Sequence, residues 1–369
     1  MTLSNCLPII KPFDNACNLK CLYCYMNGIM RSQHKAQLMD DSTLYCLIDF
    51  FCSKQKHVEF IWHGGEPLLA GLDFFKRAMF YQKAWTKSGK KIENSIQTNA
   101  TLITKEWASF FRENGFSVGV SLDGPQKMHD VMRRSRSGKC GSFDSAMNGI
   151  AILKDAGVFK GISCCVSTVN HSFPEEVLDF FISQDIKSIK FLRVKGQDQQ
   201  GNFYKGSITS DQYVDFLLAI FRKWLEIDDP ELEILDIKSV VDILLGGSFR
   251  ECVYMGECYN YVTVYSDGSI YACDALAQYD FLNFGNVKNF NYSSLNFSKF
   301  VDFVKLQRNS CKKCNWFKVC RGGCLQDRTL KAITNQVVSN ASCDSLKRFY
   351  SKIASTLKQY NLLSSELYS

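Results

Sequence analysis

The chain has 369 residues, of which 46% are hydrophobic and 22% are charged, and its formal net charge is +7. These values are ordinary for a globular protein and exclude a wholly disordered chain. The charge excess is mild and contains no long block of Lys and Arg, so no nucleic-acid partner is expected. No apolar run approaches the roughly 18 residues of a membrane span, and the N-terminal residues lack the pattern of a secretion signal. We therefore expect a cytoplasmic protein without a membrane partner.

Strands and helices alternate through roughly the first 240 residues. Short apolar runs predict strands at 7–11, 57–62, 92–97, 117–122, 161–168 and 188–194. Amphipathic stretches between them predict helices at 41–53, 71–88, 105–114, 143–156 and 174–183. This alternation predicts an α/β fold with a parallel sheet, and six such strands can form a partial (β/α)6 barrel resembling a TIM barrel. Its site would lie at the carboxyl ends of the strands.

The sequence changes character near Cys252, where turn residues and cysteines become frequent. Residues 235–247 predict a linking helix, 261–271 a β-hairpin, and 344–360 a last helix. We expect the barrel over 1–234, the linker over 235–251, a Cys-rich domain over 252–345 and a C-terminal helix over 346–369.

The 17 cysteines are the most unusual feature of the composition. In a reducing compartment, clustered cysteines favour metal ligation over disulfides. Cys17, Cys21 and Cys24 follow the first predicted strand as CxxxCxxC, a spacing that can bind three irons of a [4Fe–4S] cluster and leave the fourth iron open. The alternatives are three buried thiols or a zinc site, for which His34 is the nearest further ligand.

This pattern resembles the signature of the radical S-adenosylmethionine (SAM) enzymes. Three later segments, each at the end of a predicted strand, resemble further motifs of that superfamily: HGGEP at 63–67, QTNA at 97–100 and SLDGP at 121–125. Two adjacent glycines let the backbone approach a ligand closely, and a carboxylate can pair with the amino group of SAM. The resemblance implies a radical SAM barrel and SAM contacts from Tyr25, Gly64, Gly65, Glu66, Gln97, Asn99, Ser121 and Arg133, with Arg134 and Arg136 competing for the role of Arg133.

Eight further cysteines, with CxxCx5CxxxC at their centre, resemble the SPASM extension, a C-terminal domain with two auxiliary [4Fe–4S] clusters. A zinc ribbon is the alternative, but it would use two CxxC pairs and only one is present here. The resemblance implies three [4Fe–4S] clusters in all. Position by position it assigns an inner auxiliary cluster to Cys252, Cys258, Cys273 and Cys324, and an outer one to Cys311, Cys314, Cys320 and Cys343.

Six cysteines remain outside these sets. Four lie in apolar patterns and are interpreted as core residues: Cys46, Cys52, Cys164 and Cys165. Cys6 and Cys140 receive no role.

The implied chemistry is reductive cleavage of SAM, with an electron from a reduced donor of the flavodoxin or ferredoxin type, followed by hydrogen abstraction from a peptide or protein substrate. Asp274 directly follows Cys273. In the similar anaerobic sulfatase-maturating enzymes an Asp at this place is the proposed base, and a carboxylate beside an anionic cluster is expected to have a raised pKa. The alternative is that Asp274 caps a turn.

Two products compete. His63 and Met26 differ from the Gln and Tyr usual in sulfatase maturases and favour a maturase of ribosomal peptides that forms a C–C cross-link of the cyclophane type. The alternative is an anaerobic sulfatase-maturating enzyme that converts Cys or Ser to formylglycine. A third class, an iron–sulfur electron carrier or sensor, gives the three strand-end motifs no purpose.

Overall fold

The computed structural model describes residues 2–28, 36–195, 203–249, 251–277, 279–289, 294–328, 333 and 335–363. Its strands are β1 (Leu7–Ile10), β2 (His57–Trp62), β3 (Lys91–Thr98), β4 (Phe116–Ser121), β5 (Phe159–Val166), β6 (Ser188–Arg193), β7 (Glu233–Ile234), β8 (Tyr261–Val264), β9 (Ser269–Tyr271) and β10 (Asn283–Asn286). Its helices are α1 (Asp41–Cys52), α2 (Leu72–Lys87), α3 (Lys105–Glu113), α4 (Gln126–Met132), α5 (Phe143–Asp155), α6 (Pro174–Ser183), α7 (Ser210–Ile227), α8 (Leu235–Leu244), α9 (Cys252–Met255), α10 (Ser294–Ser310), α11 (Phe317–Cys320) and α12 (Cys343–Gln359).

The six predicted barrel strands and the five helices between them are present, with ends shifted by one or two residues. The linking helix, the hairpin and the last helix are present as α8, β8–β9 and α12. Helices α4, α7 and α10 were not predicted. Helix α10 carries buried Phe297, Phe300, Val301 and Val304, a spacing of three and four residues that could have predicted it.

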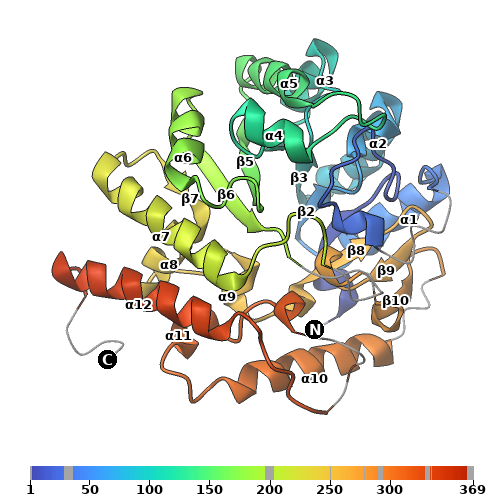
Figure 1. The fold of residues 1–369 in the computed structure, drawn as a ribbon. Coiled ribbons are helices and arrows are strands. Elements are labelled where there is room, and N and C mark those ends of the chain that lie inside the picture. Colours follow the sequence, from blue (N-terminus) through green and yellow to red (C-terminus); the bar gives the residue numbers. More distant parts are fainter. Residues whose placement is uncertain are drawn as a thin grey trace.

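One sheet runs through the described residues in the order β10-β9-β8-β1-β2-β3-β4-β5-β6-β7. Strands β1 to β7 pair in parallel, as expected of strand–helix units. Figure 1 shows these strands at the centre, with helices α1 to α7 arranged around them. The predicted α/β fold with a parallel sheet is confirmed.

The Cys-rich region extends the barrel sheet. Strand β8 pairs in parallel with β1, with Leu7 opposite Tyr261 and Ile10 opposite Val264. Strands β9 and β10 continue the sheet in antiparallel pairs. The shared sheet brings the residues after β9 next to the carboxyl ends of the barrel strands. The predicted domain boundaries at 234, 251 and 345 stay a prediction.

The core of the barrel is aromatic on the side of α2. Trp62 at the end of β2 is fully buried, packs against Phe60, Phe74 and Phe75, and donates its indole N–H to Asn94 Oδ1 at 2.9 Å. Rings in these arrangements stabilise the packing beyond the area they bury. The end of β2 is therefore rigidly placed, and the turn after it can serve as a fixed support.

Within the described residues, no helix combines the length and the apolar character needed to cross a bilayer.

Candidate active site

The loop after β1 carries the first three cysteines and is held from two sides. From β2, Gly65 N–H donates to Asp14 O at 3.1 Å and Glu66 N–H to Ala16 O at 2.7 Å. From the other side, Lys20 N–H donates to Arg134 O at 2.8 Å. A Cβ atom on Gly65 would lie 2.0 Å from Ala16 O, so only glycine permits this approach. The GGEP turn thus supports the cysteine loop directly.

The structure brings the three thiols of this loop together. Burial is the main cause that raises the pKa of Cys17 to about 12, and the charges of Glu66, Cys21 and Cys24 add to it. Burial also raises the pKa of Cys21 to about 11, with Cys24 contributing. The protein alone therefore favours the protonated forms of Cys17 and Cys21, and a bound metal cluster would release their protons.

Glu66, predicted to hold the amino group of SAM, is buried and already accepts three hydrogen bonds. The donors are Asn99 N–H at 2.8 Å, the Thr98 hydroxyl at 2.7 Å and Leu68 N–H at 3.1 Å. Burial raises its pKa to about 7, although these hydrogen bonds act in the opposite direction. Burial therefore makes the ionised form of Glu66 costly. An ammonium group beside the carboxylate would offset this cost, so Glu66 is suited to bind the amino group of SAM.

The predicted residues on β3 and β4 lie beside one another and beside the cysteine loop. Gln97 Nε2 donates to Ser121 Oγ at 3.1 Å, and Asn99 Nδ2 donates to Asn18 Oδ1 at 2.9 Å. The end of β3 therefore contacts both the end of β4 and the loop that carries Cys17. This is the arrangement expected of a ligand site at the carboxyl ends of barrel strands.

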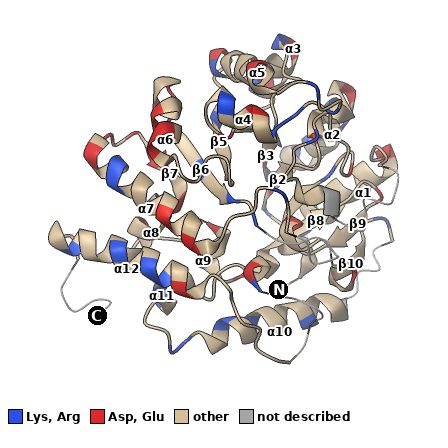
Figure 2. Ribbon diagram, viewed as in Figure 1, with Lys and Arg blue, Asp and Glu red and all other residues tan. Residues whose placement is uncertain are grey.

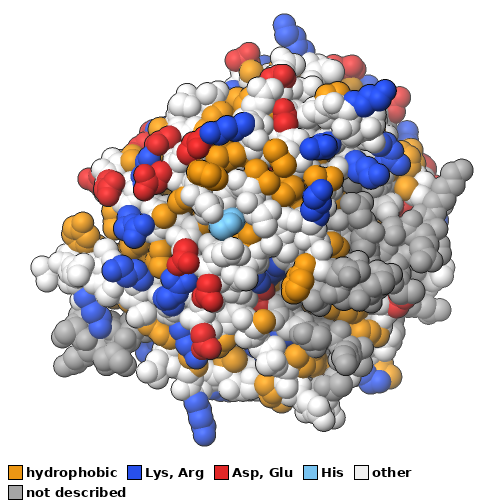
Figure 3. Space-filling model, viewed as in Figure 1, with side chains coloured by type: hydrophobic (Ala, Val, Ile, Leu, Met, Phe, Trp, Pro, Cys, Tyr) orange, Lys and Arg blue, Asp and Glu red, His pale blue; other side chains and the backbone are white. Residues whose placement is uncertain are grey.

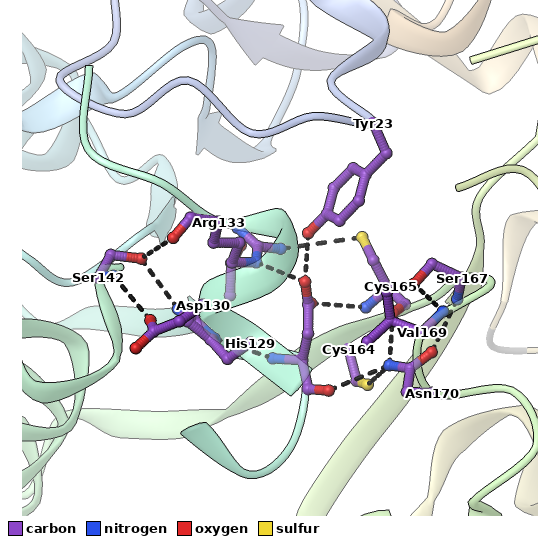
Figure 4. A network of polar contacts seen from close by, with 12 residues as sticks. Tyr23, His129, Asp130, Arg133, Ser142, Cys164, Cys165, Ser167, Val169 and Asn170 are labelled. Carbon is purple, nitrogen blue, oxygen red and sulfur yellow. Dashed lines mark hydrogen bonds and ion pairs between the residues drawn. The ribbon is translucent and has the colours of Figure 1, made fainter. Parts of the chain in front are cut away.

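Arg133 is the buried member of the three candidate arginines. Its Nε donates to Asp123 Oδ2 at 2.9 Å, and its guanidinium lies 5.5 Å from the centre of the Tyr23 ring. Tyr23 donates its hydroxyl to the same carboxylate, as Figure 4 shows. Arg134 and Arg136 are exposed on the following loop. The structure thus favours Arg133 over its competitors as an interior contact.

Cys165 also joins this network, although its sequence pattern indicated a core residue. Its backbone N–H donates to Asp123 Oδ1 at 2.9 Å, and its sulfur lies 3.8 Å from Arg133 Nη2 (Figure 4). Side chains alternate along β5, so Cys164 is fully buried in the core while Cys165 points toward the network. The apolar run alone could not distinguish the two faces.

Asp274 lies where four parts of the chain meet. Its carboxylate is 2.5 Å from Lys11 Nζ at the end of β1 and 3.7 Å from His63 Nδ1 at the end of β2. It also accepts the hydroxyl of Tyr25, which was predicted as a SAM contact. The residue after Cys273 is therefore joined to the cysteine loop and to two barrel strands.

The rise in the pKa of Asp274 that an adjacent anionic cluster is expected to cause stays a prediction, and the protein's own side chains act in the opposite direction. Burial alone would raise it, but Lys11, then His63, and the hydrogen bonds from Lys11 and Tyr25 lower the pKa below its usual value. The prediction considered the neighbouring cluster charge and missed the buried ammonium.

Lys11 is a functional candidate that sequence reasoning missed. It is completely buried, donates to Met26 Sδ at 3.1 Å, and lies 5.8 and 5.5 Å from the ring centres of Tyr25 and Tyr265. A buried Lys is rare unless it is paired. The available signal was a charged residue directly after an apolar strand and before Pro12.

The eight cysteines of the C-terminal region form two groups in space. Burial raises the pKa of Cys273 well above its usual value, and the charges of Cys258, Cys324 and Cys252 add to the rise. In the second group, burial raises the pKa of Cys320, and the charges of Cys311 and Cys343 add to the rise. The hydrogen bond with Asp344 raises the pKa of Lys347, and the charges of Cys343 and Cys314 add to that rise. These groupings are compatible with the two sets that the resemblance implies, which stay a prediction.

The donor sets fit iron–sulfur clusters. All 17 cysteines are free of disulfides. Within the described parts of the chain, no three His, Cys, Asp or Glu side chains converge on a point that could hold a single metal ion. A [4Fe–4S] cluster does not need such convergence, because each thiolate binds a different iron. Groups of three, four and four thiols are therefore compatible with three clusters.

Comparisons with known proteins agree with this arrangement. The model of the radical SAM superfamily matches residues 12–181. A cysteine-type anaerobic sulfatase-maturating enzyme of Clostridium perfringens is 32% identical over 353 residues, covering 93% of this chain and 94% of the relative. A serine-type enzyme of Bacteroides thetaiotaomicron is 30% identical over 370 residues, covering 94% and 89%.

Solved structures show the same fold. Native anSMEcpe with bound AdoMet and Cp18Cys peptide superposes with a TM-score of 0.84 at 30% identity, covering 96% of this chain and 98% of that one. Streptococcus suis SuiB bound to precursor peptide SuiA has a TM-score of 0.66 at 15% identity, covering 92% and 76%, and shares the fold. The buried strand-end site and the similarity over at least 93% of the chain show that this protein is a radical SAM enzyme and belongs to the family of the anaerobic sulfatase-maturating enzymes.

Proposed function

We propose that the enzyme oxidises a Cys or Ser side chain of a protein substrate to formylglycine. The observation that carries the proposal is the placement of Asp274, partly exposed between the cysteine loop, two barrel strands and the Cys-rich region. Relatives that share almost the whole chain are named as cysteine-type and serine-type sulfatase-maturating enzymes, which supports this product.

Cys17, Cys21 and Cys24 would hold one [4Fe–4S] cluster, and the strand-end residues Glu66, Ser121 and Arg133 would hold SAM. When bound together, SAM and the cluster supply the deoxyadenosyl radical that takes a hydrogen atom from the substrate. The protein's part is to place the substrate carbon and to keep water away from it during the hydrogen transfer. Loss of a further proton and electron would turn a Ser side chain directly into the aldehyde. The same loss would turn a Cys side chain into a thioaldehyde, which water would hydrolyse with release of hydrogen sulfide. Asp123 and Arg133 neutralise each other's charge inside the protein, so neither side chain needs water to solvate it.

Asp274 would accept the proton of the substrate side chain. Its lowered pKa keeps the carboxylate ionised at neutral pH, so it is available as an acceptor. Lys11 holds one carboxylate oxygen in place. Asp274 is therefore the catalytic residue of the proposal and Lys11 its positioning residue.

His63 would act as a hydrogen-bond donor to the substrate. Gly64 N–H donates to His63 Nδ1 at 2.8 Å, so the proton of the neutral ring lies on Nε2. Burial lowers the pKa of His63, which favours this neutral form. A neutral imidazole with Nε2–H presents one N–H donor, and the Gln usual at this position in sulfatase maturases also carries N–H donors.

The two groups of four cysteines would hold two auxiliary [4Fe–4S] clusters. Cys273 and Asp274 are adjacent in sequence, so one group lies beside the proposed base. This arrangement suits removal of the second electron of the oxidation from the substrate.

The C–C cross-link predicted from the sequence has less support. His63 and Met26 remain the observations that favour it, but the comparisons favour formylglycine.

The test is anaerobic incubation of the reconstituted enzyme with peptides, read by mass spectrometry. One peptide carries the cysteine motif of a sulfatase, its matched control carries Ala at that Cys, and a third carries an aromatic residue flanked by aliphatic ones. We expect an aldehyde in place of the thiol in the first peptide only. Loss of two hydrogens with a cross-link in the third peptide, and no change in the first, would overturn the proposal.

A further inference from the structure

Four exposed cations surround the loop that carries the first three cysteines: Lys20, Arg134, Arg136 and Lys139. Lys20 stands within the cysteine loop, and the other three stand on the loop between α4 and α5. Neither residues 15–28 nor residues 133–143 contain an Asp or a Glu. We call these four residues the basic hairpin surface.

Backbone hydrogen bonds fix the two segments against each other. Leu19 and Ser135 form an antiparallel bridge, and Arg136 N–H donates to Asn18 O at 3.1 Å. A second bridge joins Arg134 to Gly141 and closes the hairpin. Arg136 Nη1 also donates to Cys17 O at 2.8 Å. The cations are therefore attached to the cysteine loop itself and not to a remote part of the surface.

The charges of this surface are not balanced locally. Among the described residues, none of the four cations forms a salt bridge, in contrast to buried Arg133, which pairs with Asp123. Asp130 lies at the base of the hairpin, where it accepts the N–H groups of Ser142 and Phe143, and Asp144 accepts from Gln126. In the part of the chain that the structure describes, neither carboxylate forms a salt bridge with the four cations, which leaves an excess of positive charge on this surface. Figure 2 shows Lys and Arg along the loop that leaves α4, and Figure 3 shows blue side chains gathered over the same region. Uncompensated charge of one sign attracts a partner of the other.

We propose that the basic hairpin surface is the docking site of an acidic electron-transfer protein. The proposal rests on the proposed function in one respect, that Cys17, Cys21 and Cys24 hold a redox-active cluster. Arg136 contacts the carbonyl of Cys17, and Lys20 stands between Cys17 and Cys21, so a donor seated on this surface would lie close to the cysteine loop. One electron leaves the reduced donor, which becomes oxidised by one electron, and enters the cluster; no other reactant is needed.

The test uses the cluster-loaded enzyme with Lys20→Glu, Arg134→Glu and Lys139→Glu combined. Arg136 is left unchanged because it binds the carbonyl of Cys17. The matched control is Lys54→Glu, Lys56→Glu and Lys87→Glu, three exposed lysines near the amino ends of β2 and β3 with the same change in net charge. The probe is a reduced bacterial flavodoxin, and its binding is measured by titration calorimetry at low and high salt.

We expect the hairpin variant to bind the flavodoxin about tenfold or more weakly at low salt, with a reduced salt dependence, and the control variant to bind like the unmodified enzyme. Deoxyadenosine formation driven by flavodoxin should fall in the same proportion. Deoxyadenosine formation driven by dithionite, which needs no docking site, should be unchanged, and this would show that the cysteine loop is intact.

Equal affinities of the two variants would overturn the proposal. A loss with dithionite as large as the loss with flavodoxin would also overturn it, because the cations would then support the loop. Weaker binding of the substrate peptide with unchanged flavodoxin binding would assign the surface to an acidic substrate segment instead. A different peptide product would affect the proposed function alone, since flavodoxin binding is measured without substrate.

Discussion

Asp274 and Lys11 form a buried ion pair that connects the Cys-rich region to the first barrel strand. Neither residue is notable in sequence by type alone. Their ion pair holds an ionised carboxylate beside the cysteine loop. A pair of this kind is costly to break from one side, because the remaining charge stays buried.

The first prediction concerns the base. Asp274→Asn should continue to form deoxyadenosine but should slow product formation by about a hundredfold, because the amide cannot accept the substrate proton. Deoxyadenosine and product are quantified together by liquid chromatography. If product forms at the unmodified rate, Asp274 is a structural turn residue.

The second prediction separates Lys11 from Asp274. Lys11→Met keeps the length of the side chain but leaves the carboxylate without its ammonium, and should lower the free energy of unfolding by on the order of 3 kcal/mol. The double variant Lys11→Met with Asp274→Asn should recover much of this loss, because no buried charge remains. Chemical denaturation of the four proteins gives the coupling. Additive losses would show that the pair is not energetically linked.

At the scale of elements, the site depends on turns that link strand ends. The GGEP turn after β2 binds the cysteine loop, and the turn after β4 places Asp123 for Arg133. Strand ends are rigid because the sheet behind them is paired, so side chains on these turns can be held in place without loops of their own.

The third prediction follows from the packing of Gly65. Gly65→Ala should displace the cysteine loop, since its Cβ would meet Ala16 O at 2.0 Å. The reconstituted variant should lose about four irons and its SAM-dependent deoxyadenosine. Gly89→Ala is the control for backbone strain away from the cysteine loop: its φ of +87° makes Ala unfavourable, but nothing lies within 4 Å of its Cβ and it precedes the amino end of β3, so its iron content should be unchanged. Iron analysis and calorimetric SAM binding check both. Full iron in Gly65→Ala would contradict the close contact.

The fourth prediction concerns pH and His129 on α4. The Asp123 N–H donates to His129 Nδ1, and His129 Nε2 forms a hydrogen bond with Ser142 Oγ (Figure 4). Burial, the main cause, lowers its pKa to about 4. Because folding favours the neutral ring, this contribution to stability is full above the unfolded pKa of about 6.5 and is lost as pH falls toward 4.

Between pH 7 and pH 5.5 the protonation of His129 should lower the free energy of unfolding by about 1 kcal/mol. Thermal unfolding of the anaerobic protein at both pH values measures it, with His129→Gln as the variant that cannot titrate. The variant should lose less stability over this interval than the unmodified protein. An equal loss in both would assign the acid sensitivity to other groups.

At the scale of the whole molecule, a single sheet joins the barrel to the Cys-rich region. Helix α12 packs on α7 and α8 and completes the outside, as Figure 1 shows in red. The three groups of cysteines are thus carried by one continuous architecture, in which the loss of one group need not remove the others.

The fifth prediction counts the clusters. Anaerobically reconstituted protein should contain about twelve irons and twelve sulfides, which is four of each for each of three clusters. Replacing Cys17, Cys21 and Cys24 together with Ala should leave about eight irons and abolish deoxyadenosine formation. Cys320→Ala should retain some deoxyadenosine. An iron content near four per chain in the unmodified protein would contradict the assignment of the two auxiliary clusters.

The sequence by itself determined the features that depend on near neighbours. Strand–helix alternation predicted the parallel sheet, and local spacing predicted the first cysteine group, because ligands of one cluster on one loop must follow one another closely. The division of the later eight cysteines into two groups came from the resemblance to the SPASM extension. Motifs at strand ends predicted a common site, since parallel strands end at the same edge of a sheet.

Only the tertiary structure decided which distant groups meet. The pairing of β8 with β1 brings Asp274 to Lys11, whose ammonium group lowers the pKa of Asp274. The exposure of Arg134 and the burial of Arg133 depend on how one loop crosses another. The physical reason is the same in each case: charge and burial are set by neighbours in space, and residues far apart in the chain become neighbours only when the sheet is assembled.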